Sequence, residues 1–190
     1  KANVGELDQL DRLFAETKEV FDGLDILIHN AASGYNRPAM QQKPRGWEWT
    51  MNINARSLLF EAQHAAPMMR ERGGGSIVAL SSLGSVRVLP DYVVVGASKA
   101  AIESLVRYLA VELAPDHINV NAVAPGVVKT EALERFAAYR EANEGDQDVL
   151  AKLAAATPTG RLATAEEVAE LVTFLCTPAA KMICGQTIVM

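Results

Sequence analysis

Short apolar runs alternate along this chain with longer stretches in which apolar residues recur at helical spacing. The stretch 6–21 carries leucine, valine and phenylalanine three or four residues apart, which predicts an amphipathic helix. The same criteria predict strands at 24–29, 76–80, 118–123 and 186–190, and further helices at 45–72, 92–113 and 164–175. Buried strands that alternate with helices form a parallel sheet covered on both faces. We therefore expect an α/β fold, a Rossmann-like doubly wound parallel sheet.

Composition narrows the functional classes. The chain has 190 residues, enough for one domain spanning 1–190, and a net charge of −5, which gives no electrostatic support to nucleic-acid binding. The two cysteines form no C-x-x-C pair or Cys/His cluster, so no metal site is expected. No apolar run approaches the length of a membrane span. We expect a cytoplasmic protein with neither a nucleic-acid nor a membrane partner.

A glycine-rich turn between the first strand and the first helix normally opens a dinucleotide-binding fold of this type. No such turn occurs here, because the triple glycine 73–75 precedes a strand and is expected to end a helix. We therefore expect an N-terminal βαβ unit to be missing from these residues. The polar, alanine-rich segment 127–160 follows the carboxyl end of a predicted strand, where such sheets bind ligands. It is predicted to be a substrate lid, with a surface decoration as the alternative.

Five segments, in this order and spacing, resemble the short-chain dehydrogenase/reductase family across essentially the whole chain. They are Asn3-Val4, Leu24 to Ala32, Met51 to Ala55, Ile77 to Ser82 and Asn121 to Thr130. The resemblance implies a nicotinamide cofactor, NADPH with NADH possible. The implied cofactor-binding residues are Asn3, Val4, Asn30, Ala31, Ala32, Lys99, Pro125, Gly126, Val128 and Thr130.

The spacing of one tyrosine and one lysine departs from the usual family pattern. Ordinary members carry Tyr-x-x-x-Lys, but the residue four before Lys99 is Val95, and the available tyrosine is Tyr92. Tyr-x6-Lys resembles the divergent branch of enoyl-[acyl-carrier-protein] reductases, most closely the type III (FabL-type) enzymes. Seven helical residues make almost two turns, so Tyr92 and Lys99 are expected on one side, roughly 10 Å apart. We expect them to meet through the nicotinamide ribose rather than by direct contact.

The resemblance implies reduction of the trans-2 double bond of an enoyl thioester in fatty acid biosynthesis, with hydride delivered to the β-carbon. Tyr92 would stabilise the enolate, Lys99 would bind the ribose, and Ser82 would be a second hydrogen-bond partner, although Ser81 and Ser85 offer similar hydroxyls. Asn52 occupies the place of a structural or proton-relay asparagine, or makes an ordinary helix hydrogen bond. His29 ends a buried strand and is expected to be a hydrogen-bonded core histidine.

Two other functions stay open at this point. The first is a short-chain carbonyl or 3-oxoacyl reductase, which Ser82 favours and Val95 opposes. The second is a catalytically silent family member that acts as a binding subunit. The resemblance further implies an acyl carrier protein or coenzyme A thioester as substrate, and a homotetramer that pairs through the helices 45–72 and 92–113.

Overall fold

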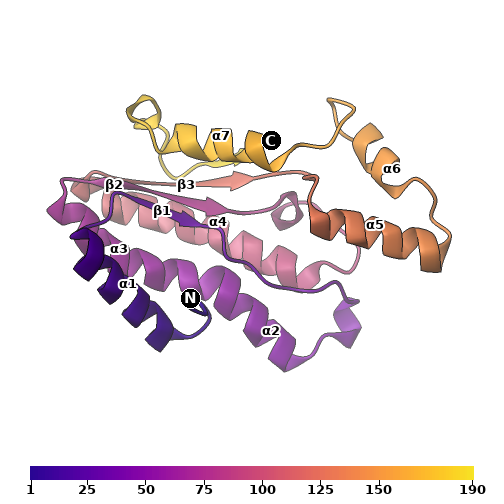
Figure 1. The fold of residues 1–190 in the computed structure, drawn as a ribbon, viewed down its shortest axis with the longest axis horizontal. Coiled ribbons are helices and arrows are strands. Elements are labelled where there is room, and N and C mark those ends of the chain that lie inside the picture. Colours follow the sequence, from indigo (N-terminus) through magenta and orange to yellow (C-terminus); the bar gives the residue numbers. More distant parts are fainter.

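Four parallel strands form one sheet and lie side by side in the order in which they occur in the chain (Figure 1). They are β1 (Ile26–His29), β2 (Gly75–Leu80), β3 (Ile118–Ala124) and β4 (Thr187–Val189). Because the strands are parallel, their carboxyl ends lie at one edge of the sheet. The arrangement confirms the predicted α/β fold with a Rossmann-like parallel sheet.

The computed structural model describes the backbone of residues 1–190 and every side chain except those of residues 132, 136, 139, 143 and 144. Within this described part, no helix is long and apolar enough to cross a membrane. No group of three or more His, Cys, Asp or Glu in the same residues could hold a metal ion.

Helices cover the sheet on both faces. Figure 1 shows α1 (Leu7–Phe21), α3 (Ser57–Glu71) and α4 (Val93–Leu113) below the sheet and α7 (Ala165–Leu175) above it. Side chains of a strand alternate between faces, so β2 contributes Ile77 to the core under the sheet and Val78 to the smaller core beneath α7. The sequence predicted these layers, because buried strands alternate with helices along the chain.

The predicted helix 45–72 contains a change of helical type. It consists of α2 (Pro44–Met51), a π-helical segment (Asn52–Arg56) and α3. Short π-helical segments inside α-helices are rare and often occur at functional sites. This segment lies beside α4 and contains Asn54, whose contacts are described below.

The segment 127–160 is more regular than the sequence indicated. It contains α5 (Glu131–Glu144) and α6 (Val149–Ala155), and Thr130 caps α5 by accepting a hydrogen bond from the Leu133 amide. Figure 1 shows both helices beyond the carboxyl ends of the strands, beside the sheet rather than on either face. Its role as a lid stays a prediction.

Candidate active site

The carboxyl edge of the sheet brings together segments that are far apart in the sequence. Loop 30–34 follows β1, Ser81 and Ser82 follow β2, and residues 125–130 follow β3. The amide of Ser81 donates to the Val123 carbonyl at 2.7 Å, and the amide of Leu83 donates to the Pro125 carbonyl at 3.3 Å. The loops after β2 and β3 are therefore bonded to each other. Ligands of open parallel sheets bind at this edge.

Lys99 reaches this edge from α4. Its side chain is buried, with 7% of the residue exposed, and its Nζ donates to the Leu80 carbonyl at the end of β2, at 2.6 Å. Burial lowers the pKa of Lys99 to about 8. An ammonium group has three N–H donors, and the described residues supply this one with a single hydrogen-bond acceptor. Two donors thus remain for a ligand.

Val95, one turn before Lys99, occupies the place of the usual family tyrosine. The residue is buried and packs against Gly34 of loop 30–34, so closely that a Cβ atom on Gly34 would overlap the Val95 side chain. Glycine at 34 therefore lets the loop approach α4. Position 95 holds a packing residue with no acid group.

Tyr92 lies at the first turn of α4 but outside the regular helix, as its N-cap residue. This corrects the predicted helix start at 92. The backbone turns at Asp91, which adopts a left-handed conformation with φ of 60°. The Tyr92 ring packs on Gly84, where a Cβ atom would lie 2.6 Å from the ring carbon Cε1. Among the described residues, none hydrogen-bonds to the Tyr92 hydroxyl, and no hydrogen bond connects Tyr92 with Lys99.

An open cavity of about 500 Å³ lies beside Tyr92. Its walls are the loop 84–91, the first two turns of α4 and Ala39 from the segment after β1. Apolar side chains, including Val88 and Leu89, dominate these walls. The cavity can accept an apolar group next to the tyrosine ring.

Three serine hydroxyls follow β2, and the structure separates their roles. Ser81 and Ser85 each donate to Oε1 of the buried Glu103, both at 2.5 Å. Ser82, which is half-buried between them, accepts a hydrogen bond from the Gly84 amide at 3.2 Å. Its own O–H has no acceptor among the described residues. Of the three, Ser82 is therefore the hydroxyl that is left to donate to a ligand.

Glu103 holds both ends of the turn that carries Ser82 and supports Tyr92. Glu103→Leu removes the acceptor of both serines, so we expect kcat to fall by about 10- to 100-fold as the turn shifts. In Glu103→Gln the amide oxygen can still accept both hydrogen bonds, so this variant should stay within about threefold of the wild type. Steady-state kinetics of the two variants test this. Equal losses in both would show that the charge matters instead of the hydrogen bonds.

Asn54 is the buried and fully hydrogen-bonded asparagine of this segment, and the expected role of Asn52, structural or proton-relay or an ordinary helix hydrogen bond, stays a prediction. Asn54 is fully buried in the π segment, and its side chain bonds to the amide and the carbonyl of Ser33 at 2.8 and 2.9 Å. Its Nδ2 also donates to Ser98 Oγ on α4. Asn52 is half-buried and makes no side-chain hydrogen bond among the described residues. The sequence held both asparagines in one motif, and only the helical phase of the π segment distinguishes them.

The predicted cofactor residues fall into two groups. Asn30, Ala31 and Ala32 are exposed in loop 30–34, whereas the residues after β3 are half-buried, except Thr130, which is exposed at the N-cap of α5. The half-buried ones are Pro125, Gly126 and Val128. All of these lie at the carboxyl edge.

Asn3 and Val4 lie apart from that group. They precede α1, and Gly5 next to them packs on Ile53 of the π segment. The predicted residues from β1, β2 and β3 are thus together, and Asn3-Val4 lies next to the π segment that holds Asn54.

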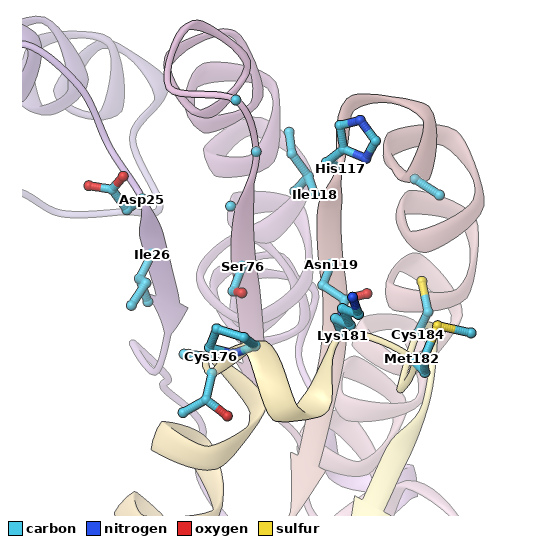
Figure 2. Close-up of a pocket in the computed structure, with 16 residues that line it drawn as sticks. Asp25, Ile26, Ser76, His117, Ile118, Asn119, Cys176, Lys181, Met182 and Cys184 are labelled. Carbon is cyan, nitrogen blue, oxygen red and sulfur yellow. The ribbon is translucent and has the colours of Figure 1, made fainter.

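A larger cavity, about 680 Å³, lies at the opposite end of the sheet. Figure 2 shows its lining side chains around the amino ends of β1, β2 and β3, with Asp25, Ser76 and Ile118 at the three strand starts. Cys176 and Cys184 also line it. None of the predicted site residues lines this cavity, so the larger of the two cavities is not at the candidate site.

Comparison with known proteins identifies the family. The family model described as enoyl-(acyl carrier protein) reductase matches residues 1–190. Human dehydrogenase/reductase SDR family member 4 is 33% identical over 98% of the chain and 65% of its own length. The chain belongs to the short-chain dehydrogenase/reductase family. Membership of the family does not specify the substrate, because the relatives of the chain are named for different reactions.

Two further relatives of this short-chain dehydrogenase/reductase illustrate that range. A tropinone reductase homolog from Arabidopsis thaliana is 35% identical over 98% of the chain and 67% of its own length. The 1-cyclohexenylcarbonyl-CoA reductase of Streptomyces collinus is 39% identical over 100% of the chain and 65% of its own length. The chain therefore spans about two thirds of the relatives it matches.

Solved structures of the family share the fold closely. L-sorbose reductase from Gluconobacter frateurii, complexed with NADPH and L-sorbose, has a TM-score of 0.93 at 28% identity and covers 100% of this chain and 73% of its own. A structure provisionally assigned as a betaketoacyl-ACP reductase has a TM-score of 0.85 at 33% identity, with 100% and 74% covered. The sheet and helices of the chain are thus those of the family's reductases.

Proposed function

We propose that the full-length protein is an NAD(P)H-dependent reductase of an enoyl thioester. The observation that carries this proposal is that Val95 and Tyr92, both at the start of α4, differ in their contacts. Val95 is committed to packing against Gly34, while the Tyr92 hydroxyl at the start of the helix has no protein partner among the described residues. The Tyr-x6-Lys spacing of the enoyl-reductase branch, most similar to its type III members, supports the same function.

The residues at the carboxyl edge fit the nicotinamide end of a cofactor. Lys99 has unused N–H donors at the end of β2, and ribose hydroxyls can accept them. Loop 30–34 and residues 125–128 would border the ring, and the bound cofactor would supply the hydride. The solved L-sorbose reductase, which shares this fold, is complexed with NADPH, which supports NADPH first and leaves NADH as the alternative.

Tyr92 and Ser82 are the hydroxyl donors of the site. As the β-carbon of an enoyl thioester accepts hydride, negative charge develops on the thioester oxygen. A preorganised O–H donor stabilises that charge more strongly in the transition state than in the substrate. Tyr92 would donate to this oxygen, with Ser82 as a second donor, and the cavity beside Tyr92 would receive the acyl group.

The name of one relative supports conjugate reduction. A 1-cyclohexenylcarbonyl-CoA is a thioester whose carbonyl is conjugated with a ring double bond, and the reductase of that name is 39% identical to this chain. Such a substrate belongs to the α,β-unsaturated thioesters proposed here.

Carbonyl reduction is the second candidate, and the comparisons favour it. The relatives and solved structures include tropinone reductase homologs, L-sorbose reductase and a protein assigned as a betaketoacyl-ACP reductase. In this alternative Tyr92 would protonate the alkoxide formed from a ketone. Ser82, with its free O–H, suits either reaction.

Crotonyl and acetoacetyl thioesters distinguish the two reactions. We expect the full-length protein to consume NADPH or NADH faster with the crotonyl thioester, because the proposed site stabilises an enolate. Faster turnover of the acetoacetyl thioester would establish the carbonyl reductase instead. Failure to bind either cofactor would favour the catalytically silent binding subunit.

The assembly and the lid belong to the same proposal. We propose that α5 and α6 in segment 127–160 close over the acyl group, and that the thioester is carried by acyl carrier protein or coenzyme A. The helices 45–72 and 92–113 expose the apolar side chains of Trp47, Trp49 and Val111, which supports a homotetramer paired through these two helices. Light scattering of the full-length protein tests the assembly, and a monomer would contradict it.

A further inference from the structure

A buried histidine–carboxylate pair lies next to the candidate site and takes no part in the proposed chemistry. Nδ1 of His29 lies 2.7 Å from Oε2 of Glu61, and Nε2 of His29 lies 2.8 Å from the backbone carbonyl oxygen of Asn54. His29 is 2% exposed and Glu61 is 5% exposed. Both polar side chains are thus removed from water, and every ring nitrogen of His29 has a partner.

The partners determine where the protons are. A carbonyl oxygen only accepts hydrogen bonds, so Nε2 of His29 must carry a proton and donate it to Asn54. The remaining contact, between Nδ1 and Glu61, then holds one proton, either on an imidazolium facing a carboxylate or on a carboxylic acid facing a neutral imidazole. Both arrangements are neutral overall, which makes the pair tolerable in a buried place.

Asn54 transmits this contact to the cofactor side of the site. Its backbone carbonyl is held by His29, while its side chain holds both the amide and the carbonyl of Ser33, at 2.8 and 2.9 Å. Its Nδ2 also bonds to Ser98 on α4. The chain of contacts runs from Glu61 on α3 through His29 at the end of β1 to loop 30–34.

We propose that His29 and Glu61 are positioning residues that hold Asn54, and through it loop 30–34, in the shape that binds the nicotinamide end of the cofactor. This inference rests on the proposed function, because it assumes that loop 30–34 contacts the cofactor. The hydrogen bonds of His29 to Glu61 and Asn54 fix the shape of loop 30–34. The charge of Glu61 does not, because a neutral group that donates to Nδ1 would keep the same histidine tautomer.

Substitutions at Glu61 separate hydrogen bonding from charge. In Glu61→Gln the amide N–H can donate to Nδ1, so His29 stays an Nε2–H donor, and the Kd for NADPH should stay within about threefold. In Glu61→Leu the histidine loses this partner, and we expect affinity to fall about tenfold or more, the scale of one lost buried hydrogen bond. Calorimetric titration of the full-length protein measures both.

The double variant His29→Leu/Glu61→Leu separates positioning from stability. The double variant removes the buried imidazole nitrogen that Glu61→Leu leaves without a partner, so the melting temperature should recover in part relative to Glu61→Leu alone. Asn54 still lacks its donor, so the affinity for NADPH should remain weak. His64→Gln is the matched control, because His64 pairs with Asp11 at a surface away from loop 30–34 and should leave the Kd unchanged.

A spectrum of the histidine side chains provides a readout that needs no cofactor. In ¹⁵N-labelled protein we expect a slowly exchanging Nε2–H of His29 in the wild type and in Glu61→Gln, and faster exchange of this proton in Glu61→Leu, where the ring has lost its contact at Nδ1. Recovery of wild-type affinity together with stability in the double variant would overturn the inference, as would equal losses in Glu61→Gln and Glu61→Leu. If the wild type binds neither NADPH nor NADH, the proposed function fails and the inference falls with it.

Discussion

Replacing Tyr92 with phenylalanine should lower kcat for enoyl thioester reduction by about 10²- to 10³-fold, the usual effect of losing one preorganised donor at a developing oxyanion. The ring would still pack on Gly84, because only the hydroxyl is removed. The melting temperature and the Kd for cofactor should therefore stay at wild-type values. Single-turnover measurement of NADPH oxidation with crotonyl thioester gives the rate of the chemical step directly.

Tyr108→Phe is the matched control for this result. Tyr108 lies on the same helix, but it is 69% exposed and far along α4 from the carboxyl edge of the sheet. Its loss of a hydroxyl should leave the rate unchanged. A rate in Tyr92→Phe within about threefold of the wild type would assign Tyr92 a packing role and remove the proposed acid from the mechanism.

Replacing Lys99 with methionine should lower kcat/KM by about a hundredfold or more, because the ribose loses the group that fixes its position. The wild-type profile should also depend on pH in a defined direction. Burial lowers the pKa of Lys99 to about 8, so kcat/KM should decline as pH rises above that value and the ammonium loses its proton. Lys99→Arg keeps its charge at high pH, and any residual activity in it should lack this decline.

The same burial makes the unfolding free energy rise with pH, whereas kcat/KM is expected to fall. Between pH 8 and about 10.4 the unfolded chain binds a proton at this lysine that the folded chain has released, so stability rises with pH across this window. Relative to Lys99→Met, the wild type should gain up to about 3 kcal/mol of unfolding free energy from pH 7 to pH 10.5. Denaturant titration at several pH values measures this gain. A difference between the two proteins that stays constant with pH would show that Lys99 is not buried as an ammonium.

Local patterns predicted the layers of the fold and most of the strand ends. The predicted helix that begins after Thr164 forms as α7, with the hydroxyl of Thr164 and the carboxylate of Glu167 capping each other's amides. The layers depend on periodicity and on the order of elements, both of which can be read from a sequence. The resemblance to the family, and not periodicity, indicated Ser82, Lys99 and Asn30 as site residues, and the structure has them at the carboxyl edge of the sheet.

Contacts between distant residues account for what the sequence did not indicate. His29 meets Glu61 32 residues away, and Ser81 meets Glu103 22 residues away. No local pattern reports that a glutamate on a helix faces inward to accept such hydrogen bonds. The burial of Asn54 but not of Asn52 likewise depends on a π-helical segment, because a change of helical phase is invisible to a search for 3.6-residue periodicity.

Tyr92 illustrates the same limit at a helix boundary. The sequence predicted the tyrosine within a helix, with almost two turns separating it from Lys99. The structure instead places it at the N-cap, after a left-handed turn at Asp91 whose carbonyl accepts a hydrogen bond from the Arg37 amide at 2.7 Å. The ring therefore lies against Gly84 and the cavity, in a position that helical geometry alone does not describe.

The position of transferred deuterium tests the central claim most directly. Full-length protein is incubated with crotonyl thioester and NADPH carrying deuterium at C4 of the nicotinamide, and the product is examined by NMR. We predict a butyryl thioester with deuterium on the β-carbon and a solvent proton on the α-carbon. Unchanged crotonyl thioester, together with deuterium at the hydroxyl-bearing carbon of 3-hydroxybutyryl thioester formed from the acetoacetyl substrate, would contradict conjugate reduction and establish carbonyl reduction in its place.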